Sequence, residues 1–450
     1  MKPPVADGSH TDDYLCHADQ GSFLGLRALG RGPVLQFTWL LGQQPDDADV
    51  MALNARLAQG LFARLLQRSP LPWGRHRWVR SATPPPVTWL TQPDPSEPAP
   101  QWRGTLPDLD VDPEIGPGWR MVVQPRRGGG CVLSVLVSHT IADGEACVQT
   151  ISDAIAGRTI DLGIPDAPRR WAAARLLRDG AESLRGLPGV GRALMTLAQR
   201  RRSASSPLAE TSPVPQRTLR DGSAQVVDVP LLLVAMDATV VEARAVDLGV
   251  AVNTLLAALA VRIAHAMARV DAGGQVKLVL PVSDRQPGDR RGNALRAVTV
   301  MAAPETCLES PRQLQRDIRA GLSALLRQGD EISALLPLIP CVPLWLARCL
   351  ERMALGSDLP VGCSILGTLP QEMERPCGAA SCLAISLRER YTIEDMNRLG
   401  GQLFLVCYRT GGRFLVTASG YAPGRITTRD EFAPLLQAAL ADLGLSGTVS

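Results

Sequence analysis

The sequence has few of the features that mark nucleic-acid-binding or metal-binding proteins. Aromatic residues make up only 4% of the chain and the net charge is +3, so neither stacking platforms nor a basic surface for nucleic acid is indicated. The ten cysteines include no C-x-x-C pair, so neither a zinc site nor a disulfide framework is predicted. We therefore expect no metal and no nucleic-acid partner.

The N-terminal residues do not resemble a targeting segment. The first residues have no apolar core of the kind found in signal peptides, and we expect the first 20 or so, which are polar, to be loose. Together with the scattered cysteines, this favours a reduced, cytoplasmic location.

One mostly apolar stretch, Ile332–Leu350, raises the question of a membrane segment. It contains Pro337, Pro340, Pro343 and Arg348, and this argues against a regular spanning helix. We predict a kinked core helix or a packed loop, with a lipid-surface segment as the alternative.

The length and the pattern of apolar residues indicate two lobes. A chain of 450 residues exceeds one ordinary core, and each half mixes strand-like apolar runs with amphipathic helical segments. Residues 200–221, rich in arginine, proline and serine, are predicted to link an N-terminal lobe (1–199) to a C-terminal lobe (222–450). Before the linker we expect one helix from about Ala172 to Leu184 and a second, short helix ending at Arg200.

The most informative segment joins a predicted strand to a predicted helix. The apolar run Cys131–Val137 indicates the second strand of a hairpin, and Glu145–Ile155 indicates a helix. Between them stands Ser138-His139-Thr140-Ile141-Ala142-Asp143-Gly144. A histidine at the end of a buried strand, followed four residues later by aspartate and then glycine, is typical of a positioned general base, because imidazole exchanges protons near neutral pH.

This motif resembles the H-H-x-x-x-D-G motif of the acyltransferase superfamily that shares the chloramphenicol-acetyltransferase fold. The superfamily includes peptide-synthetase condensation domains, plant acyltransferases of the BAHD type, polyketide-associated acyltransferases and bacterial wax ester synthase/diacylglycerol acyltransferases. Three further stretches resemble the wax ester synthase branch: Leu280–Arg285, Gly292-Asn293 with Ala297–Val300, and Cys363–Pro370. The resemblance covers roughly residues 30–445.

The resemblance implies an α/β fold of two chloramphenicol-acetyltransferase-like lobes, each a mixed sheet with flanking helices, and an active-site channel between them. It implies an acyltransferase that moves an acyl group from acyl-coenzyme A or an acyl carrier protein to a hydroxyl or amine, forming an ester or an amide. The coenzyme A or phosphopantetheinyl thioester arrives as substrate, so no tightly bound cofactor is expected. An acyl or peptidyl carrier protein is a candidate partner, and weak association with a lipid surface stays open.

The same resemblance assigns roles to individual residues. His139 corresponds to the general base, with a structural histidine as the alternative. Asp143 is expected to pair with Arg285 from the other lobe and so to fix the loop that aims His139, and it is also suited to capping the helix. Gly144 allows a close backbone approach at the helix start. Three more residues are candidates for substrate binding: Ser138, Asn293 and Ser364.

Several departures from the family pattern favour a second hypothesis. Ser138 replaces the first histidine of the motif, and residues 363–370, expected as a loop, lack the asparagine and two of the prolines of the corresponding family loop. Asn293 also fits an ordinary turn, and Ser364 an ordinary loop serine. The alternative function is a catalytically inactive, condensation-like module that recruits a partner. Of the other histidines, we expect His76 at the surface and His265 in the core or partly buried.

Overall fold

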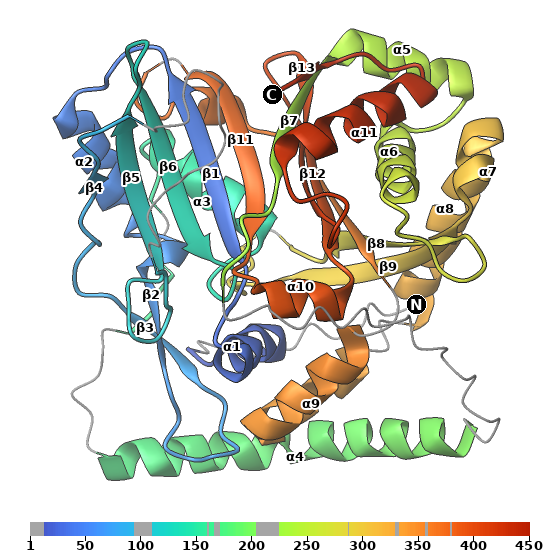
Figure 1. Ribbon diagram of the computed structural model, residues 1–450. Coiled ribbons are helices and arrows are strands. Elements are labelled where there is room, and N and C mark those ends of the chain that lie inside the picture. Colours follow the sequence, from blue (N-terminus) through green and yellow to red (C-terminus); the bar gives the residue numbers. More distant parts are fainter. Residues whose placement is uncertain are drawn as a thin grey trace.

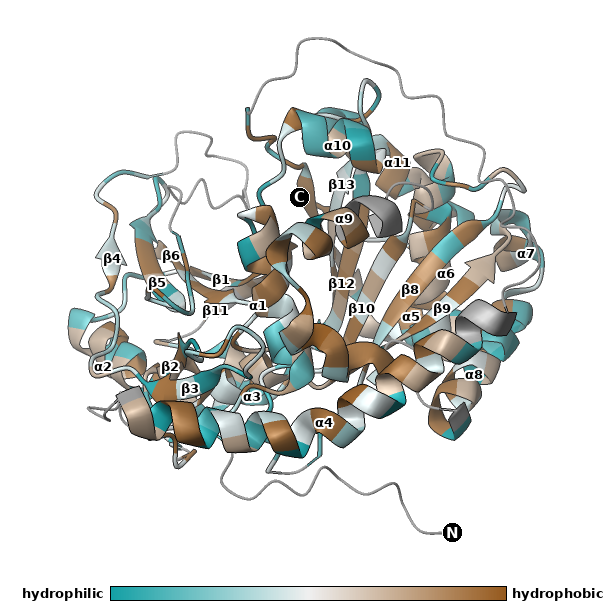
Figure 2. Cartoon of the chain, turned by 90° about the horizontal axis from the view of Figure 1, so that it is seen from below, coloured by the Kyte–Doolittle hydropathy of each residue, from teal (hydrophilic) through white to brown (hydrophobic). Residues whose placement is uncertain are grey.

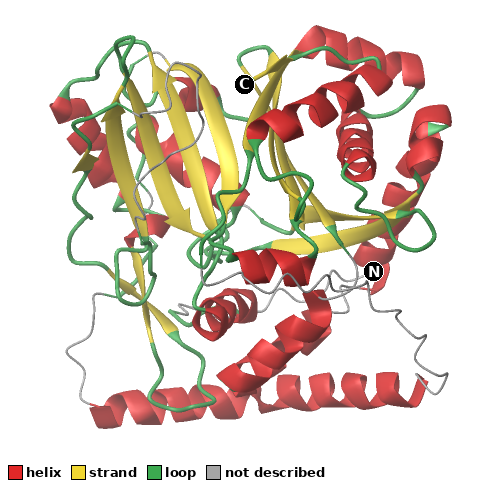
Figure 3. Ribbon diagram, viewed as in Figure 1, coloured by secondary structure: helices red, strands yellow, loops and turns green. Residues whose placement is uncertain are grey.

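The computed structural model shows an α/β protein with two mixed sheets and flanking helices (Figure 1), and Figure 3 separates its strands and helices by colour. One sheet has five strands and the other seven, and β2 (Arg64–Gln67) and β3 (Arg77–Arg80) form a separate ribbon. The fold class expected from the sequence is confirmed. The structure describes residues 13–93, 110–159, 162–165, 172–203, 225–286, 288–328, 333–355, 359–378 and 380–450.

The first sheet is built around the strand that leads into the histidine motif. β6 (Cys131–Ser138) pairs antiparallel with β1 (Val34–Leu41) on one side and β5 (Trp119–Pro125) on the other. β4 (Thr88–Trp89) follows β5 at one edge, and β11 (Ala380–Arg388) pairs with β1 at the other. The hairpin predicted from the sequence is present as β5 and β6. Because β6 is hydrogen-bonded on both sides, its end is a fixed point for the motif.

The second sheet is formed by the second half of the chain. Its strands are, in spatial order, β14 (Thr448–Val449), β7 (Leu231–Asp237), β13 (Arg413–Tyr421), β12 (Gln402–Thr410), β10 (Val361–Thr368), β8 (Val276–Ser283) and β9 (Leu295–Ala302). β10 lies parallel to both of its neighbours, β8 and β12. The late strands predicted at 383–387, 403–408 and 414–419 are present as β11, β12 and β13.

Strand β11 departs from the predicted division into two lobes. In sequence it lies between β10 and β12, which are neighbours in the second sheet, yet it pairs with β1 of the first sheet. A parallel pair needs a crossover connection, and this crossover supplies a strand to the other lobe. One strand of the predicted C-terminal lobe (222–450), β11, therefore belongs to the sheet of the N-terminal lobe. The linker predicted at 200–221 stays a prediction, since residues 204–224 lie outside the described part of the chain.

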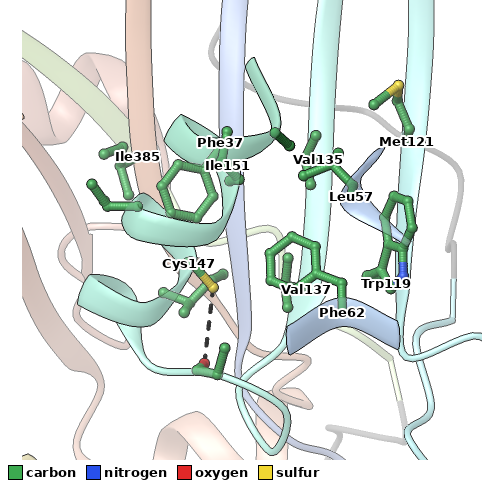
Figure 4. Packing of buried hydrophobic residues seen from close by; sticks show 14 of the residues in the cluster. Phe37, Leu57, Phe62, Trp119, Met121, Val135, Val137, Cys147, Ile151 and Ile385 are labelled. Carbon is green, nitrogen blue, oxygen red and sulfur yellow. Dashed lines mark hydrogen bonds between the residues drawn. The ribbon is translucent and has the colours of Figure 1, made fainter. Parts of the chain in front are cut away.

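Each sheet has its own apolar core. In the first, α2 (Asp47–Leu57) and α3 (Gly144–Ile155) pack with the inner strands, as Figure 4 shows for Phe37, Val135 and Ile151. In the second, the central helix is α6 (Val252–Ala266), which is buried from Thr254 to Val261. The remaining helices of this lobe are α5 (Ala238–Leu248), α7 (Pro304–Glu309), α8 (Pro311–Gln328) and α11 (Arg429–Asp442).

The helices do not provide a regular membrane span. Within the described residues no single helix is long and apolar enough to cross a bilayer. Only α5 and α6 taken together pass that test, and they are bent by 91°. Short elements complete the chain: η1 (Leu61–Ala63), η3 (Gln371–Glu374) and α10 (Ile393–Leu399).

A layer of helices lies along the bottom of the molecule in Figure 1. α1 (His17–Leu29) contacts η2 (Ser333–Cys341) and α9 (Leu344–Leu355), and η2 also contacts α4 (Ala172–Ser203). α4 is one continuous helix, so the prediction of two helices was wrong. It passes through Pro188, which lies on the exposed side, where water can satisfy the carbonyl that lost its N–H partner.

The apolar stretch at 332–350 forms η2 and the start of α9. The helical segment is interrupted, as its prolines suggested, since η2 ends at Cys341 and α9 begins at Leu344, but the expected core position is wrong because no residue of η2 is buried. Ile332 lies outside the described residues. The stretch is instead a partly exposed segment between α1 and α4.

Candidate active site

The histidine motif is a tight connection between β6 and α3. β6 ends at Ser138, and the N–H of Ile141 donates to the Ser138 carbonyl over 2.9 Å to close the turn. α3 begins at Gly144 with Asp143 as its N-cap, because the Asp143 carboxylate accepts from the Ala146 N–H over 2.8 Å. The strand, turn and helix predicted from the sequence are therefore all present, and His139 follows directly after the strand.

The backbone of His139 is anchored on both sides. Its N–H donates to the Pro33 carbonyl over 3.0 Å, and its own carbonyl accepts from Nδ2 of Asn293 over 2.9 Å. The side chain is half-buried, and no hydrogen bond to the imidazole is found among the described residues. The main chain is thus fixed while the ring nitrogens are left for another group to approach.

Asp143 and Arg285 form a buried ion pair across the two lobes, as the resemblance implied. Nη2 of Arg285 lies 2.9 Å from Oδ2 of Asp143, and the two side chains are 5% and 0% exposed. Arg285 also donates to the carbonyls of Arg291 and Gly292, each over 3.0 Å. Asp143 accepts in addition from the Ala294 N–H over 2.8 Å. The pair therefore ties the histidine loop to the segment after β8.

Asn293 contacts the protein itself. Its Nδ2 donates to the carbonyl oxygens of His139 and Thr140 and, over 3.0 Å, to Oδ1 of Asp19. The residue is buried, and its amide protons already have these acceptors. The structure therefore argues against Asn293 as a donor to substrate and instead makes it the link that holds the His139 backbone.

Asp19 is a member of the site that the sequence did not indicate. It is fully buried and accepts from the N–H groups of Gly292 and Asn293 over 3.1 and 2.7 Å. Burial raises the pKa of Asp19, while the Asn293 hydrogen bonds and the Arg64 charge oppose that rise. Cys16 caps the start of α1 through a 3.4 Å contact with the Asp19 N–H. The expectation of a loose beginning therefore fails from residue 13 onward.

Arg64, the cation beside Asp19, was also missed. It lies at the start of β2 and is 2% exposed, and burial lowers its pKa to about 10. Its Nη2 donates to the Arg290 carbonyl, while Nε and Nη1 have no hydrogen-bond partner within the described part of the chain. The sequence does not indicate that Arg64 is buried beside an acid, because its acidic neighbour, Asp19, is 45 positions away.

Gly144, at the start of α3, lies close to strand β10 of the second sheet. Residues 361–368 form strand β10, so the loop expected at 363–370 is wrong for most of its length. A Cβ on Gly144 would lie 3.1 Å from Cδ2 of Leu366, so a second-lobe side chain causes the close approach expected at this glycine. Side chains alternate along a strand, so Ser364 shares the face of Leu366, on the side of the histidine motif.

Ser138 differs from the other substrate-binding candidates in its position. It is the last residue of β6, its N–H donates to the Gly118 carbonyl over 3.0 Å, and it is buried. Ser138 is therefore less accessible to substrate than His139 and Ser364, which are both partly exposed. Six of the seven candidates lie where the histidine loop meets the segment after β8, and the seventh, Ser364, lies on β10, two residues before the Leu366 side chain that approaches Gly144.

Comparison with protein-family models and with curated protein sequences finds no match. Solved structures do match. Polyketide synthase associated protein 5 from Mycobacterium tuberculosis is 14% identical with a TM-score of 0.53, over 98% of this chain and 99% of that one. The first condensation domain of the calcium-dependent antibiotic synthetase, in complex with a substrate analogue, is 14% identical with a TM-score of 0.59, over 96% of each chain.

A larger enzyme matches in part. The nonribosomal peptide synthetase FmoA3 is 16% identical with a TM-score of 0.56, and the match covers 99% of this chain but 46% of that one. This chain therefore spans about half of that synthetase structure. At these identities the likeness establishes the fold. The chain has the two-lobed, chloramphenicol-acetyltransferase-like fold of condensation domains that its sequence resembles.

Proposed function

We propose that the protein is an acyltransferase that moves an acyl group from a thioester to a hydroxyl or amine, with His139 as the general base. The observation that carries the proposal is the combination at His139 of a main chain anchored by Pro33 and Asn293 and a partly exposed imidazole without a hydrogen bond from the described residues. A structural histidine would be expected to use its ring in such a bond.

The proposed reaction is a direct transfer. The imidazole takes the proton of the acceptor hydroxyl or amine while the acceptor oxygen or nitrogen attacks the thioester carbonyl carbon. The tetrahedral intermediate then expels the thiolate, which receives the proton from the imidazolium. The products are an ester or amide and a free thiol, so no acyl-enzyme is required. A positioned base contributes about 10²- to 10⁴-fold to such a step.

The neighbouring residues would position this base. Asp143 and Arg285 are buried and engaged with each other, so we assign them to holding the loop rather than to proton transfer. Asn293 holds the carbonyl of His139 itself. Fixing a reacting group in this way lowers the barrier because its orientation is set before the substrates arrive. Ser364, on the facing strand, is the remaining candidate for a polar contact with substrate.

The donor in this proposal is acyl-coenzyme A or an acyl group on the phosphopantetheine of a carrier protein. The fold likeness to condensation domains supports a carrier protein as a candidate partner, and neither donor requires a resident cofactor. The acceptor class, and with it the choice between ester and amide, is part of what the experiment decides.

The test is thioester turnover. The protein is incubated with a panel of acyl-coenzyme A and acyl-carrier thioesters plus pooled alcohols and amines, and products are detected by mass spectrometry. His139→Ala is expected to lose activity by about 10²- to 10⁴-fold with its circular dichroism unchanged. His265→Ala is the matched control, because that imidazole is 46% exposed on α6 of the other lobe.

Two results would contradict the proposal. Equal product from His139→Ala would remove His139 as the base. Absence of product with every donor, while the folded protein still binds a carrier protein, would favour the alternative of an inactive module that recruits a partner. The second result would fit the presence of Ser138 in place of the first histidine of the resembled motif.

A further inference from the structure

Helix α4 has a row of large apolar side chains on its outward face. Leu177, Leu184, Leu187 and Leu194 are between 53% and 78% exposed. They follow one another at intervals of seven, three and seven residues, which on a helix of 3.6 residues per turn places them within about 100° of one another, on one face. Met195, beside the last of them, is also more than half exposed. Figure 2, which views the molecule from below, shows hydrophobic positions alternating with hydrophilic ones along α4.

The inward face of the first half of the helix is polar and makes several side-chain contacts. Asp179 is buried and accepts hydrogen bonds from Tyr14 and Ser69, over 2.9 and 2.7 Å. Glu182 pairs with Arg75 over 2.7 Å. A surface helix usually turns its apolar face inward, and the first half of α4 does the reverse. Because the polar contacts fix its rotation, the apolar row cannot turn into the protein without breaking them.

The charge on the outward face is of one sign. Arg185 lies next to Leu184 and its side chain is 79% exposed, with its Nη1 3.9 Å from Oε2 of Glu182, and Arg192, two residues before Leu194, is exposed as well. The acidic residues of the described helix, Asp179 and Glu182, are 0% and 13% exposed at their side chains, on the inward side. This arrangement is complementary to a surface with an apolar interior for the leucines and anionic groups at its border for the arginines.

The exposed apolar surface continues beyond α4. The helix packs beside η2, where a Cβ on Gly189 would lie 3.5 Å from Pro337, and no residue of η2 is buried. Directly after η2, Trp345 at the start of α9 is 64% exposed. In Figure 1, α4 extends across the bottom of the molecule, below both lobes, and Figure 2 shows from below that it bends along its length. Because the bend is seen from below and not in the side view of Figure 1, the exposed helix can still lie against a planar surface.

We propose that α4 docks the protein on the surface of a lipid bilayer that contains anionic lipids. The leucines and Met195 enter the boundary between headgroups and acyl chains, and Arg185 and Arg192 reach the lipid phosphates. A second copy of the chain fits less well. It would bring the same arginines together, and the described part of α4 offers no exposed acid to pair with them. This site lies outside the residues assigned to acyl transfer.

The test is flotation of the full chain with vesicles of phosphatidylcholine containing about one third phosphatidylglycerol, compared with phosphatidylcholine alone. The protein is expected to float with the anionic vesicles, and less at high salt. Leu184→Gln combined with Leu187→Gln is expected to weaken binding on the order of tenfold. Val246→Gln, at a residue of α5 that is 77% exposed, is the control and should float like the wild type.

Different failures have different meanings. No flotation of the wild type, or equal flotation of the double leucine variant, would overturn the proposal. A dimer in analytical ultracentrifugation that the double variant converts to a monomer, without any vesicle binding, would overturn it in favour of a second copy as the occupant. Since all changed side chains are exposed, the variants should fold, and neither readout depends on acyl transfer.

Discussion

The side-chain amide of Asn293 donates a 2.9 Å hydrogen bond to the backbone carbonyl of His139, although the two residues are 154 positions apart. The same amide nitrogen lies 3.0 Å from Oδ1 of the buried Asp19. The histidine proposed as base is therefore held by a residue of the second lobe, which in turn is held by the first helix of the chain. This linkage makes the orientation of His139 depend on contacts distant in sequence.

Replacing Asn293 should affect activity more than stability. In Asn293→Ala, His139 loses its second-lobe anchor, and we expect turnover to fall on the order of 10²-fold. Stability should fall by about 1–3 kcal/mol, because buried acceptors lose their donor. Asn293→Asp should be worse than alanine in both respects, because its carboxylate would face Asp19 and two carbonyl oxygens. Thioester turnover and urea unfolding of the three proteins give the order, and an aspartate variant as active as wild type would contradict this role.

The ion pair between Asp143 and Arg285 should be a large contributor to stability. Arg285→Met leaves a buried carboxylate without its cation, and we expect the free energy of unfolding to fall by about 3–5 kcal/mol. Adding Asp143→Asn should restore part of the loss, because it removes the uncompensated charge. Urea denaturation measures both variants, and no recovery in the double variant would argue against the pair as the cause.

The control is an arginine whose ion pair is open to solvent on both sides. Arg409 pairs with Glu242 over 2.7 Å, and the two side chains are 39% and 41% exposed, so solvent already screens the pair. Arg409→Met should therefore lower the free energy of unfolding by less than about 1 kcal/mol. Comparable losses at positions 285 and 409 would mean that burial of the pair is not the deciding factor.

Gly292 should tolerate no side chain. A Cβ at this position would lie 2.3 Å from the carbonyl oxygen of Ile141, in the histidine loop, and backbone cannot yield as a flexible side chain can. We expect Gly292→Ala to reduce the free energy of unfolding by about 2 kcal/mol or more and to reduce turnover, since the loop must shift. Gly128→Ala, in the turn between β5 and β6 with no atom within 4 Å, is the control and should change stability by less than about 0.5 kcal/mol.

The local part of the site could be predicted from the sequence because its signals are local. The apolar run before Ser138, the capping aspartate at 143 and the glycine at 144 together specify a strand, a turn and a helix, and these are the elements observed. Arg285 was expected only through resemblance to a family, since nothing in its own neighbourhood indicates a partner 142 positions away.

The remaining parts depend on tertiary contacts. Asp19 and Arg64 are isolated charged residues in segments without periodicity, and only the folded chain brings them together. Two of the other histidines show the same limit. His76 was expected at the surface and is half-buried against Phe23, whereas His265 lies on the more exposed side of an apolar helix, with 46% of its side chain exposed. Composition around a residue does not reveal which face of its element is covered.

His76 should make stability depend on pH. Its ring lies edge-on to Phe23 with centroids 5.4 Å apart, and its Nδ1 accepts from the Ser69 N–H over 3.3 Å. Burial, together with the nearby Arg68 charge, lowers the pKa of His76 to about 4. An unfolded histidine has a pKa of about 6.5, so between these values the unfolded chain binds a proton that the folded protein excludes. Stability should therefore fall as the pH drops from about 6.5 towards 4.

The size of this effect can be isolated by substitution. Between pH 7 and pH 5, His76 should account for a loss of about 1–2 kcal/mol, allowing for the partial exposure of its ring. His76→Gln is uncharged in both states and should flatten this part of the pH dependence, even if it is less stable at pH 7. Urea unfolding at both pH values gives the difference for wild type, His76→Gln and the exposed-site control His265→Gln. His76→Gln eliminates only the titration of the His76 imidazole. An equally steep loss of stability in this variant would therefore show that other groups cause the pH dependence.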